Sequence, residues 1–202
     1  MNYVSTGQRI MKKFSFIAAL MICVTLAAAI PSQAQNGDSS DSSEYLIKAG
    51  FTYNFAKLME WPAGTFPQAD SPIVIGVLGV DPFGGTLDDV LKGKTVNGRE
   101  FVVKHLKDGA DLRSLNILFV SDSELPHLDE ILHTVKNLPI LTIGETAGFA
   151  QRGGIINFVV EDNKVRFEIN VDAATQANIN ISSRLLSLAK IVHTLPPDGR
   201  KP

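Results

Sequence analysis

Two hydrophobic periods alternate along the chain, and they predict an alternation of helices and strands. In residues 44–60 the apolar positions recur at spacings of three and four and form two adjacent stripes. This pattern predicts a helix that is buried on two sides, with Ser42 or Ser43 as its N-cap. Runs of mostly apolar, often β-branched residues predict strands. These runs are residues 73–79, 100–106, 116–120 and 139–143.

Polar segments after two of these runs predict the connections. Residues 81–85 are rich in Gly and Pro and predict a loop, after which Thr86 can cap a helix that runs to about Lys92. After the third strand, Ser121 or Ser123 can cap a second helix with one apolar face. Each connection therefore carries a helix between two strands.

The pattern changes in the last third of the chain. Residues 154–160 and 165–170 flank a polar turn and predict a β-hairpin. In its second strand, apolar residues alternate with Arg166, Glu168 and Asn170, which predicts one buried face and one more polar outer face.

The remaining apolar stripe, in residues 172–192, predicts a long final helix. Strand–helix alternations followed by a hairpin and a helix predict a three-layer α/β/α single domain. We expect a mostly parallel sheet with an antiparallel edge hairpin. This domain covers residues 44–195, between a flexible polar tether at 35–43 and a disordered tail at 196–202.

The N-terminus has the pattern of a secretory signal peptide. A basic pair at 12–13 precedes the uncharged apolar run 14–30, and small residues stand at the −3 and −1 positions before the bond that follows Ala34. We expect residues 1–34 to be cleaved on export to the periplasm. Because the run is close to the shortest length that spans a bilayer, a retained anchor is the alternative. Met11 is an alternative start that leaves a signal of ordinary length.

Cleavage removes the only cysteine, Cys23, and makes the chain more acidic. The 202-residue chain has 19 basic and 21 acidic residues. Loss of Arg9, Lys12 and Lys13 leaves 16 basic residues and a net charge of −5 with histidine neutral. This balance gives no basic footprint for nucleic acid and no polybasic patch for a membrane surface. Without cysteine, the exported chain can form no disulfide and no thiolate metal site.

Motifs for hydrolytic, nucleotide and metal chemistry are missing from the sequence. It contains no G-x-S-x-G elbow, no Walker lysine after a glycine loop and no H-E-x-x-H. The four histidines lack the short fixed spacing of a zinc site. They are His105, His127, His133 and His193. We therefore expect no enzymatic activity, no metal and no cofactor.

Gly84, Gly85 and Thr86 form the first group of candidate ligand-binding residues. They lie where a predicted strand passes into a helix, and free N–H groups at a helix start favour an anion. A simple turn out of the sheet is the structural alternative. Open α/β sheets bind ligands beyond the carboxyl ends of their strands, which here means near 81–86 or 144–148.

The second candidate group combines the hairpin with the predicted final helix. Arg166, Glu168 and Asn170 share one face of a strand, and Ser182 and Arg184 follow on the helix. Together they predict a polar pocket whose guanidinium groups can bind a carboxylate or a phosphate of a small anionic ligand. The alternative is a local Arg166–Glu168 pair on an exposed face, which stabilises little.

Several blocks of sequence resemble the YfiR family. Residues 45–57, followed by Glu60-Trp61-Pro62, resemble the opening helix of that family. Further blocks that resemble it are residues 75–84, 141–144, 153–158, 165–170 and 181–186, of which the last three are the most specific. The blocks run in order from Tyr45 to Val192, which is nearly the whole predicted domain.

This resemblance implies a periplasmic regulatory protein that restrains an inner-membrane partner. In the best-known system the partner is a diguanylate cyclase with a periplasmic sensing domain; a sensor kinase or an outer-membrane transport system is an alternative. The resemblance also implies a homodimer and, for some members, a small ligand. Some members carry disulfides that affect activity, which the exported chain lacks. A periplasmic small-ligand-binding protein is the second hypothesis for function.

Overall fold

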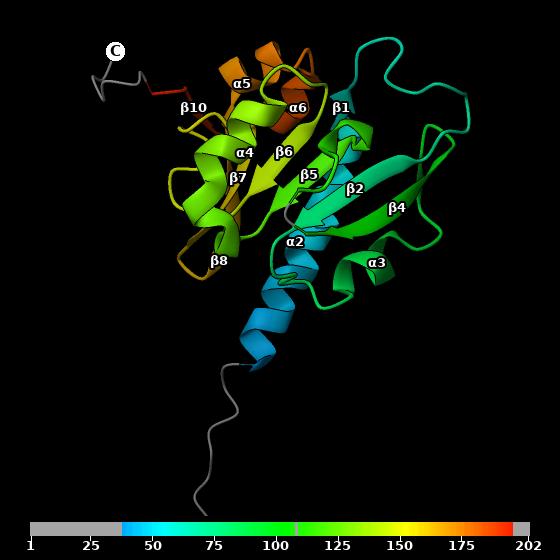
Figure 1. The fold of residues 1–202 in the computed structure, drawn as a ribbon. Coiled ribbons are helices and arrows are strands. Elements are labelled where there is room, and N and C mark those ends of the chain that lie inside the picture. The colour runs from blue at the N-terminus through cyan, green and yellow to red at the C-terminus, as the bar shows by residue number, and fades with distance from the viewer. Residues whose placement is uncertain (1–37, 108, 196–202) are drawn as a thin grey trace, which may run out of the picture. The chain divides into compact units, whose positions relative to one another are not determined.

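An eight-stranded sheet lies at the centre of the chain (Figure 1). The computed structural model describes residues 38–107 and 109–195. The strands of this sheet are β2 (Ile73–Leu78), β3 (Thr95–Val96), β4 (Arg99–Leu106), β5 (Ile117–Val120), β6 (Leu141–Gly144), β7 (Ile156–Glu161), β8 (Lys164–Asn170) and β10 (Lys190–Val192). Their order across the sheet is β10-β8-β7-β6-β5-β2-β4-β3.

Most neighbouring strands are parallel, as the sequence predicts. β4, β2, β5, β6 and β7 all run in the same direction. β8 returns antiparallel to β7 through a turn in which Asp162 and Asn163 both have positive φ, as tight hairpin turns require. The hairpin lies near one edge, but β10 pairs parallel to β8 and forms the edge itself.

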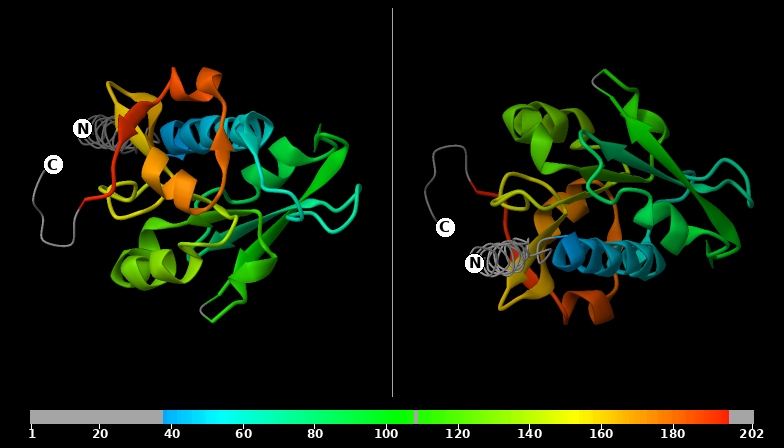
Figure 2. Two further views of the ribbon diagram at one scale, coloured as in Figure 1. Left: turned by 90° about the horizontal axis from the view of Figure 1, so that it is seen from above. Right: turned by 90° about the horizontal axis from the view of Figure 1, so that it is seen from below.

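Helices cover both faces of the sheet. They are α2 (Asp38–Leu58), α3 (Thr86–Leu91), α4 (Leu128–Val135), α5 (Val171–Gln176) and α6 (Ser183–Leu186), with the short 3₁₀ helices η1 (Leu112–Ser114) and η2 (Asp122–His127). Figure 2 shows α2 and α4 on opposite sides of the strands. A separate two-stranded sheet joins β1 (Met59–Glu60) to β9 (Asn180–Ile181).

Alternation of side chains along the central strands gives the molecule two cores. In β5, Ile117 and Phe119 pack with α2, α3, α5 and α6, whereas Leu118 and Val120 pack with α4 and η1. All four side chains are buried. A strand covered on both faces must be apolar throughout, which is why the sequence shows continuous runs here. The predicted three-layer single domain is confirmed.

The opening helix is longer than the sequence pattern predicts at its start and shorter at its end. α2 begins at Asp38, so Ser42 and Ser43 lie inside the helix and neither is its N-cap. It ends at Leu58, where the chain becomes extended to pair with β9. Because the first residues of α2 are polar in sequence, hydrophobic spacing alone misses its true start.

Three smaller expectations about caps also need correction. The residue before α3 is Gly85, with φ 89, and Thr86 is the first helical residue and provides no side-chain cap. Ser121 precedes η2 without a side-chain cap hydrogen bond, and Ser123 lies within η2. The helix expected after β5 therefore starts as a 3₁₀ turn and becomes α-helical only at Leu128.

The predicted final helix over 172–192 is wrong. This segment instead forms α5, β9, α6 and β10 in succession. Asn178 adopts φ 54 just after α5, a left-handed conformation that ends a helix and that Asn tolerates. Ser182 then caps α6, since its hydroxyl accepts a hydrogen bond from the Leu185 N–H at 3.3 Å. Local polar side chains thus override the helical spacing of the apolar residues.

Parts of the sequence prediction lie outside the described residues. These are the signal peptide over 1–34, the first residues of the tether and the tail at 196–202. Within residues 38–107 and 109–195, no helix combines the length and the apolar composition that a membrane crossing requires.

Candidate functional site

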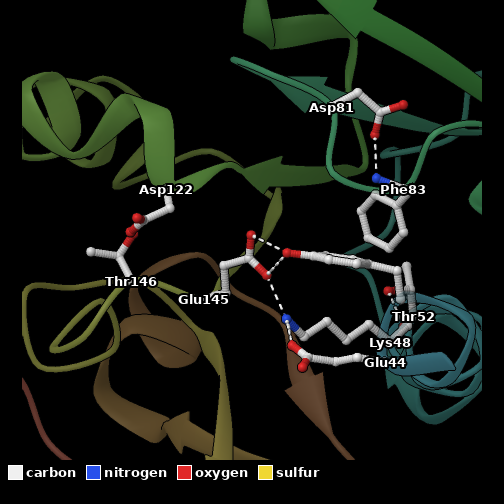
Figure 3. Close-up of polar contacts among 9 residues, drawn as sticks. Glu44, Lys48, Thr52, Asp81, Phe83, Asp122, Glu145 and Thr146 are labelled. Atoms are coloured by element: carbon white, nitrogen blue, oxygen red, sulfur yellow. Dashed lines mark hydrogen bonds and ion pairs between the residues drawn. The ribbon is translucent and has the colours of Figure 1, made fainter. Parts of the chain in front are cut away.

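Acidic residues follow three parallel strands that are neighbours in the sheet. Asp81 comes shortly after β2, Asp122 after β5 and Glu145 directly after β6. Because the carboxyl ends of parallel strands meet at one edge, the three carboxylates come to the same side of the molecule (Figure 3). This carboxyl edge is where open α/β sheets most often bind ligands.

Helix α2 brings a buried lysine to this edge. The Lys48 ammonium contacts carboxylate oxygens of both Glu44 and Glu145 at 2.6 Å (Figure 3). Only 4% of the Lys48 side chain is exposed, and 10% of the Glu145 side chain. Glu44 and Lys48 lie one helical turn apart, so they meet on one face of α2. The Lys48–Glu145 ion pair therefore joins α2 to the loop after β6.

Tyr45 completes the contact between α2 and the sheet edge. Its hydroxyl lies 3.2 Å from Glu145 Oε2 and donates to that carboxylate, while the Lys48 ammonium lies 4.4 Å from the centre of its ring. Burial, and then the negative charge of Glu145, raise the pKa of Tyr45 well above its ordinary value. The ring also packs edge-on against Phe83 in the loop after β2.

A cavity of about 450 Å³ opens beside this cluster; we call it the Lys48 cavity. Its walls come from the start of α2, the loops after β5 and β6, and the strand β7. They are Glu44, Tyr45, Lys48, Asp122, Glu145, Ala147, Asn157, Phe158, Val159 and Val160. Three carboxylates face one ammonium, so the walls carry a net negative charge. This balance suits a hydroxyl-bearing or amine-bearing group better than an anion.

The charged groups of this cluster are already paired with one another, which suits the cluster to binding a partner or a ligand. Lys48 is already bound by two carboxylates, and Thr146 donates to Asp122 at 2.9 Å. Groups held by such short charge-assisted hydrogen bonds are well placed to fix a geometry. Among the residues that the structure describes, no three His, Cys, Asp or Glu side chains gather in a geometry that could hold a metal ion.

Glu168 and Asn170, predicted as members of a polar pocket, instead hold a loop. At these two positions the expected polar face of the hairpin is buried against the loop that contains Ala150 and Gln151, since Glu168 is 5% exposed and Asn170 is fully buried. Asn170 donates from Nδ2 to the Ala150 carbonyl at 2.6 Å, and Glu168 accepts from Gln151 Nε2 at 3.1 Å. Lys190 of β10 donates to the second oxygen of Glu168 at 2.9 Å.

The other three residues of the predicted pocket do not lie with Glu168 and Asn170. Arg166 pairs with Glu161 at 3.7 Å, not with Glu168. Ser182 is engaged as the cap of α6, and Arg184 lies exposed on that helix. Within the described ranges, no hydrogen bond or ion pair joins these residues to Glu168 or Asn170.

Gly84 and Gly85 lie in the loop after β2, as predicted, and Thr86 begins α3, but all three lie outside the walls of the Lys48 cavity. Both glycines have positive φ, which lets the chain turn sharply into α3. The second location named from the sequence, residues 144–148, does contribute to the cavity through Glu145 and Ala147.

The hydrophobic pattern does not identify the cavity residues, but the positions of their charges along the sequence are a partial signal for them. Asp122 and Glu145 each follow an apolar strand within two residues, and Lys48 stands between apolar residues of a helix. A lysine in an apolar stripe and acidic residues at strand ends can be predicted to meet only when the strands are known to be parallel neighbours. That order comes from the fold and is absent from the spacing of residues.

Comparison with known proteins places the chain in a family. No curated protein matches it. A solved structure, a conserved domain protein from Vibrio cholerae O1 biovar El Tor strain N16961, aligns with a TM-score of 0.46 and 14% identity. The alignment covers 71% of this chain and 59% of that one, so the chain spans less than two thirds of its length.

The YfiR/HmsC-like family model matches residues 45–190, a range that begins at Tyr45 and contains the loop after β6. All walls of the Lys48 cavity except Glu44 therefore lie within the matched segment. The chain belongs to the YfiR/HmsC-like family.

Proposed function

We propose that this chain is a non-catalytic periplasmic repressor that binds and restrains an inner-membrane diguanylate cyclase. The family match over residues 45–190 is the observation that carries the proposal. Binding in the periplasm lowers cytoplasmic cyclic-di-GMP, because the restrained cyclase makes less of it. A sensor kinase as the membrane partner is the alternative.

The start of α2 offers a surface for that partner. Leu46 is 54% exposed, Ile47 45% and Val160 of β7 53%; we call these three residues the α2 face. Val160 lines the Lys48 cavity, and Leu46 and Ile47 stand in the sequence of α2 between its wall residues Tyr45 and Lys48. Exposed apolar side chains next to buried polar groups are the ordinary composition of a protein–protein interface. Figure 1 shows the first turns of α2 reaching beyond the ends of the strands.

The polar cluster supports recognition by keeping this surface rigid. The Lys48 ion pairs tie α2 to the loop after β6, so the exposed residues next to Lys48 hold one position before a partner arrives. Preorganisation of this kind lowers the entropy cost of association. We further propose that the chain reaches the periplasm by cleavage near Ala34, and that it works there as a homodimer.

Nucleotide levels in living cells test the proposal. In a strain without the gene, we expect higher cyclic-di-GMP by mass spectrometry, restored by the unchanged chain. The double variant Leu46→Glu/Ile47→Glu folds, because both side chains are exposed, but fails to restore the level. The matched control Leu188→Glu, at a 67% exposed position after α6, restores it.

Leu188 is a suitable control because its segment lies at the other end of α2 from Leu46 and Ile47. Ser182, the residue that caps α6, donates from its N–H to the Leu58 carbonyl at 3.0 Å. Leu46 is about 18 Å away along the helix axis, at 1.5 Å per residue. An unchanged nucleotide level in the deletion strain, or full restoration by the double variant, contradicts the proposal.

A small-ligand-binding function is the second candidate, and the Lys48 cavity is the observation that favours it. Its volume lies in the range of small-molecule sites. A thermal-shift screen of amino acids, nucleotides and organic acids checks this function. A ligand present at 100 times its Kd stabilises the chain by about 2.7 kcal/mol. If no member of the screen shifts the Tm, this candidate is removed.

A further inference from the structure

A second cavity, of about 400 Å³, lies on the face of the sheet that α4 covers. Its walls come from the end of β2, residues 109–112, η2 and α4. They include the apolar side chains of Leu78, Leu112 and Ile131. None of the contacts described above for the Lys48 cavity involves these walls. We call it the Glu124 cavity.

Glu124 is a mostly buried residue whose carboxylate faces the open space of this cavity without a protein partner. The residue is 9% exposed and lines the cavity. Its carboxylate makes no hydrogen bond or ion pair with any described residue. A carboxylate in a cavity whose walls offer it no hydrogen bond is free to take a counter-charge or hydrogen bonds from a ligand. The missing counter-charge is what a bound ligand would supply.

The backbone fixes Glu124 at this position. Its side chain packs against Gly79, where an added Cβ would lie 2.8 Å from both Glu124 Cγ and Oε1. Gly79 has φ +92, and the residue after it is held to η2, since the Val80 N–H donates to Ser123 Oγ at 2.9 Å. Any larger residue at position 79 would push the carboxylate out of the cavity wall.

The remaining walls select for positive charge. Glu130 adds a second carboxylate and His127 an imidazole, and the walls contain no Lys or Arg. The aliphatic side chains of Leu78, Leu112 and Ile131 supply apolar contact next to these acids. An anion is disfavoured by this arrangement, and a fully polar cation would leave the apolar wall unused.

The position in the fold also favours a ligand site. The chain leaves β2 through α3, on the α2 side, to reach β4, whereas it leaves β5 through α4, on the opposite side, to reach β6. The strand order therefore reverses between β2 and β5. Such a switch point, at the carboxyl ends of the strands, is where open α/β sheets bind ligands. Leu78 ends β2 and Glu124 follows β5, so both sides of the switch point form the cavity.

We propose that the Glu124 cavity binds a small organic cation, an ammonium or guanidinium group on a short aliphatic chain. The cationic group lies against Glu124 and Glu130, and the aliphatic chain lies against Leu78, Leu112 and Ile131. This site is independent of the proposed contact of the α2 face with a membrane partner.

Three five-carbon probes that differ in charge test this proposal. Methyl resonances of the purified chain are followed by NMR during titration with n-pentylamine, pentanol and valerate. We expect n-pentylamine to shift the signals of Leu78, Leu112 and Ile131, and to bind at least about tenfold more tightly than the other two.

Two substitutions identify the carboxylates that bind. Glu124→Gln keeps the shape of the side chain and lowers the affinity for n-pentylamine at least about tenfold, as expected for loss of a charged hydrogen bond. Glu130→Gln, at an exposed position of α4, folds in any case and lowers the affinity less. The control Glu100→Gln, exposed on β4, leaves it unchanged.

Three results overturn the proposal. One is equal binding of n-pentylamine and valerate, and another is an affinity that neither Glu124→Gln nor Glu130→Gln changes. The third is a set of shifts confined to residues of the Lys48 cavity. Because this titration needs no membrane partner, its failure leaves the proposed repressor function standing, and the reverse also holds.

Discussion

Lys48 is a buried charged side chain in the middle of α2. An ammonium group loses its hydration on burial, and only a close counter-charge compensates that loss. Glu44 and Glu145 supply it at 2.6 Å each, one from the same helix and one from the loop after β6. The same ion pairs therefore satisfy the charge and attach α2 to the carboxyl edge of the sheet.

Replacement of Lys48 leaves two carboxylates close together without a counter-charge. We expect Lys48→Met to lower the free energy of unfolding by about 3 kcal/mol, as for a broken buried ion pair. The matched control is Lys57→Met on the same helix, whose lysine is exposed and lies over the Tyr53 ring. It should cost less than about 1 kcal/mol. Urea unfolding followed by circular dichroism measures both, and equal losses would contradict the role of Lys48.

Glu168 couples the stability of the β10 edge to pH. Burial raises the pKa of Glu168, but hydrogen bonds from Lys190 and Gln151 outweigh burial and leave the pKa below its ordinary value of 4.5. A carboxyl group with a lowered pKa stabilises the folded state above its unfolded pKa, and this contribution is lost as pH falls through the folded pKa.

We therefore expect the unfolding free energies of the unchanged chain and of Glu168→Gln to converge on acidification. The difference is largest near pH 6 and shrinks as pH falls below 4.5, where Glu168 becomes protonated. Urea unfolding at a series of pH values measures it, with the exposed Glu100→Gln as control. A difference that stays constant from pH 6 to the acid limit would show that Glu168 does not act through its charge.

At the scale of elements, glycines show which segments are packed tightly and which are open. A Cβ added at Gly154 would lie 2.0 Å from the Phe149 ring, so this loop closes on the sheet only because residue 154 has no side chain. Gly50 lies in the interior of α2, with no atom within 4 Å of an added Cβ. The same substitution should therefore act in opposite directions at these two positions.

Gly50→Ala should stabilise the chain by about 0.5–1 kcal/mol, because alanine is the better helix former and the space is free. Gly154→Ala should destabilise it by at least about 1–3 kcal/mol, since Phe149 must move. Thermal unfolding of the two variants measures both signs. A loss of stability in Gly50→Ala would mean that α2 packs against something at that position.

Asn170 holds three elements together through one amide. Its Oδ1 accepts hydrogen bonds from the first N–H groups of α5, and its Nδ2 donates to Ala150 and to Thr194 Oγ1. Asn170→Ala should lower the unfolding free energy by about 2–3 kcal/mol, through a lost cap and an unpaired buried carbonyl. Ser182→Ala, which removes only the single cap bond of α6, should cost about 1 kcal/mol. Equal costs in urea unfolding would contradict this.

The elements that the sequence predicts well are those whose pattern is set by burial. The runs that became β2 and β5 are apolar throughout because helices cover both faces, and burial is what hydropathy records. The final helix failed because its apolar positions match a helical period by spacing alone. Asn178 and Ser182 stop the helix through local geometry, which weighs more than that spacing.

At the scale of the whole molecule, strand order places the site. The chain alone shows acids after the apolar runs and a lysine in the opening helix, but not which runs become neighbours. The order β6-β5-β2 brings Asp122 and Glu145 to one edge, and α2 crosses to meet them. For Glu168 and Asn170, likewise, only the fold shows that a loop lies over them.

The Lys48 cavity and the Glu124 cavity lie on different faces of the sheet. The Lys48 cavity adjoins α2, and the Glu124 cavity adjoins α4. Under the two proposals, the Lys48 cavity borders the surface that meets a membrane protein, and the Glu124 cavity takes a small cation. Two separate sites on one small domain would allow a ligand to change partner binding, if it favours one of two conformations.

In-cell photo-crosslinking tests the central claim, that the α2 face contacts a membrane signalling protein. A benzophenone amino acid is placed at position 46, 47 or 160, and at position 188 as control, in the exported chain. We predict adducts with an inner-membrane diguanylate cyclase from the first three positions and none from position 188. Adducts to such a protein from position 188 alone, or none from the α2 face, would contradict the claim.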